Sequence, residues 1–421
     1  MNTIQIKNRK IGDGYPAYII AEMSANHSGS IERAKEIIRA AKESGADCVK
    51  IQTYTPDTLT IDCHNQYFQI DNGTWEGENL YTLYGKAYTP WEWHKELKEE
   101  ADRIGIDFFS TPFDTTSVDF LEELGVDFYK IASFEMIDLP LLRYIASKGK
   151  PIIMSTGMGT KEEIKEALEA IYEMGNEQVA ILKCSSAYPA ISDDMHLRTI
   201  ADMKKVFDIP VGLSDHSMGH LGATTAVALG ANVIEKHFCI SRDIENPDAS
   251  FSMEPSEFKE MVEQVRQVEK AMGNVFYGVS LQEESSKSFR RSIFVVKDLK
   301  KGDVITAEHV RVIRPGYGEK PKYMDDILGM KVGCNVEWGN PFSFDMLCKN
   351  SILLLTDDKN TEIPYEIAKE YDGHEVYRIG NKVTLDLVQK MQPEIIICQN
   401  YKHGIPEDVV EFMNGQVVEL S

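Results

Sequence analysis

The sequence YIIAEMSANHSGSIERAKEIIRAAKESGADCVKIQTY (residues 18–54) determines the architecture of this chain. An apolar run (18–24) leads through a segment whose apolar residues have helical spacing (31–46) into a second apolar run (48–54). Two strands that are joined by a helical crossover pair in parallel, whereas antiparallel neighbours need only a short turn. These residues therefore predict one strand–helix–strand unit of a parallel sheet.

The same unit recurs along the chain to about residue 275. Eight strands that alternate with helices over roughly 260 residues have the size of a (β/α)8 TIM barrel. We therefore predict an α/β fold with a barrel domain at residues 1–280, and a doubly wound open sheet is the alternative. The further strand-like runs are 107–113, 128–133, 151–157, 179–185, 210–216 and 233–238.

Three regions depart from this pattern. The connection at residues 55–90 is unusually long and rich in aromatic residues, as lids and specificity loops are. After residue 280 the long helical segments stop, which predicts a small, mostly β domain at 281–350. Residues 351–421 alternate strand-like and helix-like segments again and predict a short α/β extension.

The composition limits the partners of the chain. Lysine and arginine number 45 against 67 acidic residues, so the net charge of -22 repels nucleic acid and anionic membrane surfaces. We find no secretory signal and no apolar run of the ~18–20 residues that a bilayer-spanning helix needs. Seven scattered cysteines without a CxxC pair indicate neither a disulfide framework nor a structural zinc site. We expect a cytoplasmic protein that binds neither nucleic acid nor membrane.

Polar residues gather at the predicted carboxyl ends of all eight strands. These ends form the active-site face of a barrel, and residues two apart on a strand share a side. Burying so many polar groups without a ligand would be costly, so a site explains them better than separate helix caps. The residues are Glu22, Lys50, Gln52, Thr111, Lys130, Ser133, Ser155, Ser186, Tyr188, Ser214, His216, Glu235 and His237.

These residues alone leave several chemistries open. Lys50 and Lys130 suit a substrate with a phosphate and a carboxylate, but a lysine inside a barrel can also form the Schiff base of an aldolase. His216 and His237 suit two imidazole ligands of a labile divalent cation, or they are ordinary hydrogen-bonded histidines. A barrel that has lost its chemistry and serves as a non-catalytic binding scaffold is the third possibility.

Nine motifs in fixed order resemble the sialic acid synthase family over residues 15–350. They are AEMSANHSGS (21–30), VKIQTY (49–54), FFSTPFD (108–114), YKIAS (129–133), MSTGM (154–158), LKCSSAYP (182–189), GLSDHS (212–217), EKHF (235–238) and DASFS (248–252). The resemblance implies a (β/α)8 barrel followed by an antifreeze-protein-like (SAF) domain. It also implies condensation of phosphoenolpyruvate with the open-chain aldehyde of an N-acetylated sugar.

The resemblance assigns roles to individual residues. His216 and His237 match the ligands of a divalent metal, Mn2+, Mg2+ or Co2+. Arg314, within RPGYG, matches an arginine that reaches the active site of a partner subunit, which implies a domain-swapped homodimer. Positions around phosphoenolpyruvate match Lys50, Lys130, Ser133, Ser155, Ser186 (often asparagine in the family) and Ser214, whereas sugar-contacting or acid–base positions match Glu22, Tyr188 and Asp248. For activation of the attacking water we predict Glu22 and Glu235.

Within the family, the long loop YFQIDNGTWEGENLYTLYGKAYTPWEWH (67–94) resembles the pseudaminic acid synthases. The expected sugar is then 2,4-diacetamido-2,4,6-trideoxy-L-altrose, with N-acetylneuraminate and legionaminate synthesis as the alternatives inside the family. The segment from 351 resembles the opening half of a formyltransferase-like Rossmann unit without that family's catalytic residues, so we expect no activity from it.

Overall fold

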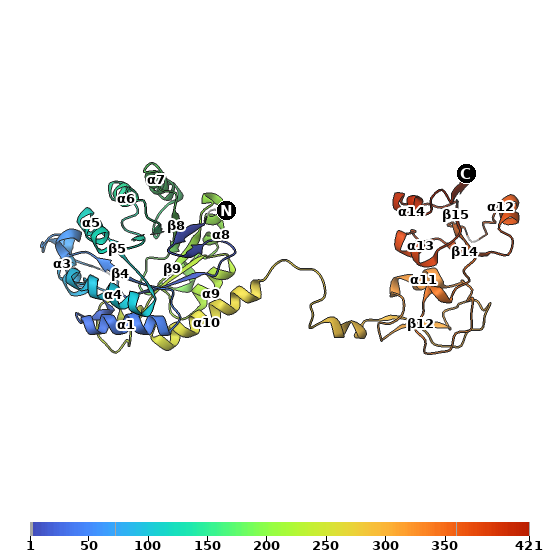
Figure 1. The fold of residues 1–421 in the computed structure, drawn as a ribbon, viewed down its shortest axis with the longest axis horizontal. Coiled ribbons are helices and arrows are strands. Elements are labelled where there is room, and N and C mark those ends of the chain that lie inside the picture. Colours follow the sequence, from blue (N-terminus) through green and yellow to red (C-terminus); the bar gives the residue numbers. More distant parts are fainter. Residues whose placement is uncertain (1–2, 72, 359, 421) are drawn as a thin grey trace. The chain divides into compact units, whose positions relative to one another are not determined.

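The computed structural model describes residues 3–71, 73–358 and 360–420. The chain divides into two compact units, residues 1–275 and 276–421 (Figure 1). The first unit holds all the predicted strands of the barrel, and the second holds the residues predicted to form the small β domain and the α/β extension.

Eight parallel strands, counted over the described part of the first unit, close into a barrel in the order β10-β3-β4-β5-β6-β7-β8-β9. Pairing of β10 with β3, from Val233↔Tyr18 to His237↔Glu22, closes the sheet. The predicted (β/α)8 barrel is therefore confirmed, and the open doubly wound sheet is wrong. The strands are β3 (Tyr18–Glu22), β4 (Cys48–Thr53), β5 (Asp107–Pro112), β6 (Tyr129–Ile131), β7 (Ile152–Ser155), β8 (Val179–Cys184), β9 (Val211–Asp215) and β10 (Val233–His237).

The long helices surround the barrel on its outside (Figure 1). In α1, for example, the buried residues Ala34, Ile37, Ile38 and Ala41 follow helical spacing, and the Ser30 side chain caps the first turn. The helices are α1 (Ile31–Glu43), α4 (His94–Ile104), α5 (Thr115–Leu124), α6 (Leu139–Ala146), α7 (Lys161–Tyr172), α8 (Thr199–Phe207), α9 (Leu221–Ala228) and α10 (Pro255–Met272), with 3-10 turns η1 (Ser24–His27), η4 (Ser192–Asp194) and η5 (Ala249–Phe251).

The long connection between β4 and α4 folds into short elements of its own. Asn79 holds it together, because its side chain donates to the backbone oxygens of Cys63 and Phe68 and accepts from the first turn of α3. We call residues 73–79 the lid tip. The elements are α2 (Pro56–Leu59), η2 (Gln66–Phe68), α3 (Leu80–Ala87) and η3 (Trp91–Trp93).

An N-terminal hairpin that we did not predict covers the other end of the barrel. Its strands β1 (Ile4–Ile6) and β2 (Arg9–Ile11) pair antiparallel. Ile4, Ile6 and Ile11 are buried in one apolar cluster with inward barrel residues such as Ile20 and Phe109. The barrel is thus packed from this end, which leaves the carboxyl ends of the strands as the open face.

The second unit combines the predicted β domain and α/β extension around one apolar core. Tyr377 of the extension accepts from the backbone N–H of Cys348, and its hydroxyl donates to the backbone oxygen of Lys331. Lys390 pairs with Glu319 at 2.8 Å. The first part contains η6 (Glu284–Phe289), β11 (Ser292–Val295), β12 (Val310–Ile313), η7 (Pro321–Tyr323), α11 (Met324–Ile327) and η8 (Phe344–Met346).

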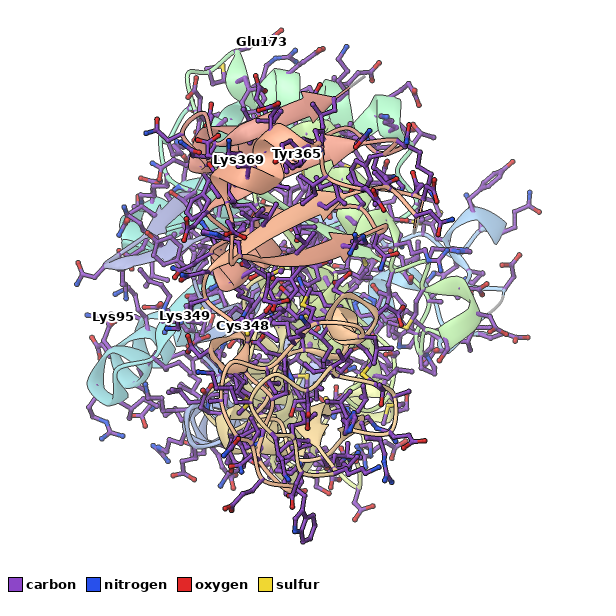
Figure 2. The ribbon with its side chains drawn as sticks, turned by 90° about the vertical axis from the view of Figure 1, so that its right-hand side faces the viewer. Lys95, Glu173, Cys348, Lys349, Tyr365 and Lys369 are labelled. Atoms are coloured by element: carbon purple, nitrogen blue, oxygen red, sulfur yellow. The ribbon has the colours of Figure 1, made fainter. Side chains whose placement is uncertain are left out.

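The extension is a parallel four-stranded sheet, as described, in the order β14-β13-β15-β16. Ile367 of α12 and Tyr371 directly after it pack against the sheet, whereas the labelled Tyr365 and Lys369 lie on the face of α12 toward the viewer in Figure 2. The elements are β13 (Ser351–Leu355), α12 (Tyr365–Glu370), β14 (Glu375–Ile379), α13 (Leu385–Met391), β15 (Ile395–Gln399), α14 (Glu407–Phe412) and β16 (Val417–Leu420).

Two expectations about covalent and membrane features can be compared with the structure. All seven cysteines are free. Within residues 3–71, 73–358 and 360–420, none of the helices has both the length and the apolar character needed to cross a bilayer.

Candidate active site

The interior of the barrel changes from apolar to polar near the carboxyl ends of its strands. Along β3 the buried Ile20 is followed two residues later by Glu22, and along β4 Cys48 is followed by Lys50. Because alternate residues of a strand share a face, these polar side chains form the layer directly above the apolar one. The sequence places a charged layer at the open end of the barrel in this way.

Two lysines and two glutamates form a buried ion cluster in this layer. Glu235 Oε1 accepts from Lys50 Nζ at 2.8 Å, from Lys130 Nζ at 2.9 Å and from Ser214 Oγ at 3.2 Å. Lys50 Nζ also lies 2.7 Å from Glu22 Oε2. The formal charges cancel, which is the condition under which buried ions are tolerated.

The cluster shifts the pKa values of its members. Burial, aided by the charge of Lys130 and opposed by the attraction of Glu235, lowers the pKa of Lys50 to about 7. Burial by itself raises the pKa of Glu235, but Lys130 and Lys50 outweigh that effect and hold it well below the usual value. Glu235 is therefore a charged anchor for the two ammonium groups. An anionic substrate with its own oxygens would offer these ammonium groups further partners.

The two predicted histidines lie together at the same end of the barrel. Their ring centroids are 5.3 Å apart. Nδ1 of His216 lies 2.9 Å from the backbone oxygen of Ser185, a contact that assigns the proton to Nδ1 and leaves Nε2 available. Burial, aided by the charges of His216 and Lys50, lowers the pKa of His237 well below its usual value. The Tyr188 ring packs on His216 at 4.3 Å.

These histidines fit a cation that also takes ligands from its substrate. His237, with its lowered pKa, is neutral and presents a lone pair. Burial by itself lowers the pKa of His216, but interaction with Cys184 outweighs it and raises the pKa, so His216 would present a lone pair at Nε2 only after losing a proton. A backbone hydrogen bond such as the one His216 makes commonly orients metal-binding histidines. No group of three or more His, Cys, Asp or Glu in the described residues could hold a metal ion. A metal bound here would depend on oxygen ligands from substrate or water, which suits a labile divalent cation.

Several predicted hydroxyl groups point to a ligand. Within the described part of the chain, Thr111 Oγ1 and Ser155 Oγ are buried without a hydrogen-bond partner. Ser133 Oγ accepts from the backbone N–H of Gly157 at 3.0 Å. A Cβ at Gly157 would lie 2.1 Å from Ser186 Oγ and 2.8 Å from Ser133 Oγ, so any larger residue would displace these hydroxyls. The hydroxyls thus converge with the lysines on the same face.

Gln52 and Asp248 complete the predicted set in the barrel. Gln52 Nε2 donates to Glu22 Oε1 at 3.2 Å and to Ser24 Oγ at 3.0 Å. Asp248 Oδ2 accepts from the backbone N–H of Ala25 at 3.0 Å. Both residues therefore connect the polar layer to the loops that follow β3 and β10.

A cavity of about 420 Å³ opens beside His237. One side is polar, with Gln52, Asp248 and His237 among its lining residues. The larger part is apolar and aromatic. It is lined by Tyr54, Leu59, Ile70, Trp75, Leu80, Leu83, Tyr84, Phe113, Phe134, Tyr188 and Phe251.

Glu135 also lines this cavity, and we did not predict it from the sequence. Its Oε2 is buried, with no hydrogen-bond partner among the residues described. Burial raises the pKa of Glu135 to about 7. The available signal was its position two residues after Ser133, but Glu135 lies beyond the end of β6, where the alternation of a strand no longer predicts direction.

Arg314 lies in the second unit, directly after β12, and is exposed. The predicted residues that the structure brings together are therefore those of the barrel. The contribution of Arg314 to a site remains a prediction from the resemblance.

Family models match both the barrel and the small β domain that follows it. The model of the NeuB family matches residues 37–277, and the model of the SAF domain matches residues 290–347. Both matches end before the α/β extension begins.

Individual relatives match most of the chain. A pseudaminic acid synthase of Campylobacter jejuni is 45% identical over 77% of this chain and 94% of its own length. One from Helicobacter pylori is 41% identical over 78% of this chain and 97% of its own length. The solved structure of an N-acetylneuraminic acid synthetase from Leptospira borgpetersenii in complex with citrate has a TM-score of 0.61 at 30% identity, over 68% of this chain and 95% of that one. This chain belongs to the NeuB family.

Proposed function

We propose that the chain is a metal-dependent pseudaminic acid synthase. It condenses phosphoenolpyruvate with 2,4-diacetamido-2,4,6-trideoxy-L-altrose and water, and releases phosphate by cleavage of the C–O bond. The observation that carries the proposal is the buried lysine pair, which faces the same barrel end as two histidines and an aromatic cavity. Two relatives that bear this name support the choice of branch. Phosphate release that requires both substrates together is the direct test.

The lysines and hydroxyls suit phosphoenolpyruvate. Lys50 and Lys130 supply ammonium donors, which Glu22 and Glu235 balance in the described structure. Thr111 and Ser155 supply hydroxyl groups without partners among the described residues. Charge-assisted hydrogen bonds to phosphate and carboxylate are stronger than neutral ones. We assign Ser133, Ser186 and Ser214 to the same substrate.

The histidines and the cavity suit the sugar. A divalent metal held by His216 and His237 would supply Lewis-acid polarisation of the aldehyde. Tyr188 and Asp248 flank this position and hold the sugar close to the enol carbon of phosphoenolpyruvate. Attack of that carbon forms the C–C bond, water adds at the resulting cationic C2, and the adduct loses phosphate to leave the 2-oxo acid.

Proton transfer falls to the carboxyl groups. Glu235 is a weak base, because the two lysines hold its pKa low. Glu22, which contacts Lys50 and Gln52, is the candidate that orients the attacking water. Glu135, with its pKa raised to about 7 by burial, is the candidate that donates a proton to the aldehyde oxygen as it becomes a hydroxyl.

The pH dependence of kcat tests the role of Glu135. A general acid must be protonated, so the wild-type rate should fall as the pH rises through about 7. Glu135→Gln should lower kcat by about 100-fold and remove this descending limb. Glu123→Gln, an exposed substitution on α5, is the control and should keep both the rate and the profile. An unchanged limb near pH 7 in Glu135→Gln would contradict the assignment.

We propose that the enzyme acts in the cytoplasm as a domain-swapped homodimer. Seven free cysteines fit a reducing compartment. Tyr277 and Leu281, near the start of the second unit, are 96% and 98% exposed, and Phe134 and Met158 at the open end of the barrel are 60% and 64% exposed. Apolar surface of this kind favours cover by a second copy of the chain.

A further inference from the structure

The lid tip joins two other loops of the open face through its side chains. Trp75 Nε1 donates to the backbone oxygen of Pro247 at 3.0 Å. Thr74 Oγ1 donates to the backbone oxygen of Tyr188. One contact lies in the loop after β10 and the other in the loop after β8, so a single turn of the lid connects two loops that are distant in sequence.

The ring of Trp75 extends this connection toward the histidines. It lies 5.4 Å from the Tyr188 ring and 6.3 Å from that of Phe251. Tyr188 packs on His216 at 4.3 Å, and Phe251 lies 4.9 Å from His237. Trp75 is therefore connected to His216 through the ring of Tyr188 and to His237 through the ring of Phe251.

Trp75 also lines the apolar part of the cavity. Tyr54 and Tyr84 lie there with ring centroids 5.8 Å apart, and Leu83 is buried beside them. If the aldehyde carbon is held at the histidines, the far carbons of an open-chain sugar extend along this wall. Against the rings of Trp75, Tyr54 and Tyr84 and the side chain of Leu83, a methyl group would gain apolar contact, whereas a hydroxyl would lose hydrogen bonds to water.

We infer that Trp75 is a specificity-determining residue that favours sugars whose distal end carries methyl groups, namely a 6-deoxy carbon and the methyl of an acetamido group at C4, over sugars with hydroxyls at those positions. The inference rests on the proposed function, since it presumes that the aldehyde lies at the histidines. Trp75 acts in two ways: its ring forms the wall, and its N–H to Pro247 fixes that wall across the cavity.

The test measures kinetic constants for two alternative sugars and for phosphoenolpyruvate in the same assay. Trp75→Ala should raise the KM for 2,4-diacetamido-2,4,6-trideoxy-L-altrose at least about tenfold. The preference for this sugar over N-acetylmannosamine, measured as the ratio of kcat/KM values, should fall by a similar factor. The KM for phosphoenolpyruvate should change less than about twofold, because Lys50 and Lys130 lie outside the contacts of Trp75; a general loss of structure would move both KM values.

Two further variants separate the contributions. Trp75→Phe keeps an aromatic wall but loses the N–H, so it should keep more of the selectivity than Trp75→Ala. Tyr67 lies in the same connection and is 79% exposed. Tyr67→Ala removes its ring and should leave the KM for the sugar and the KM for phosphoenolpyruvate unchanged.

The outcomes are distinct. An active wild-type enzyme whose sugar preference survives Trp75→Ala would overturn the inference and leave the proposed function intact. Equal rises in both KM values in Trp75→Ala would also overturn it, as they indicate a structural role. A wild-type chain that turns over neither sugar would overturn the proposed function and the inference with it.

Discussion

Replacing His237 with alanine is expected to lower kcat for condensation by about 10³-fold, which corresponds to the several kcal/mol that a bound metal contributes to a developing charge. The same result is expected for His216→Ala. The two losses should not add in the double variant, because either histidine alone leaves an incomplete ligand pair. Phosphate release at saturating Mn2+ measures the rate, and electron paramagnetic resonance of free Mn2+ measures binding.

The neighbouring histidine provides the control. His220 is exposed at the start of α9, four residues after His216. His220→Ala should bind Mn2+ and turn over substrate at the wild-type level. Wild-type Mn2+ binding by His237→Ala, with kcat within tenfold of the wild type, would favour the interpretation of both residues as ordinary hydrogen-bonded histidines.

A heterodimer of two inactive variants is expected to regain about half of the wild-type activity. The variants are Arg314→Ala and His237→Ala, each strongly impaired as a homodimer. If Arg314 serves the barrel of the partner, one of the two sites in the heterodimer contains both residues, and the other contains neither. Co-expression with two different affinity tags isolates the heterodimer for measurement of kcat.

The alternative arrangement gives a clear contrast. If Arg314 served its own barrel, each site of the heterodimer would lack one residue, and the heterodimer would be as inactive as both homodimers. Arg311 is exposed on β12, three residues before Arg314, and Arg311→Ala is the control. It should leave kcat unchanged, whichever barrel Arg314 serves.

The barrel was predictable because apolar strand-like runs and segments with helical spacing alternate along its whole length. The apolar runs predicted all eight strands, and every observed strand end lies within two residues of the predicted one. Polar residues at the carboxyl ends of the strands, together with alternation along each strand, then predicted that residues such as Glu22 and Lys50 share the active-site end of the barrel. These two features depend only on local sequence, and they carried most of the candidate site.

Features that depend on distant contacts were not predictable in the same way. The hairpin that holds Ile6 carries only two three-residue strands, and its burial requires the closed barrel. The direction of Glu135 depends on a turn after β6, and the position of Trp75 depends on backbone oxygens more than 100 residues away in the sequence. In the second unit, likewise, the Tyr377 hydroxyl donates to the backbone oxygen of Lys331, and no periodic pattern in the sequence predicts a contact between these two residues.

The most direct test of the proposed function is phosphate release from phosphoenolpyruvate by the full chain with Mn2+, measured in parallel with two sugars. The account predicts turnover with 2,4-diacetamido-2,4,6-trideoxy-L-altrose and little or none with N-acetylmannosamine. Turnover of N-acetylmannosamine alone would retain the condensation chemistry but contradict the pseudaminic branch. If no phosphate were released with either sugar, the proposed function would be contradicted.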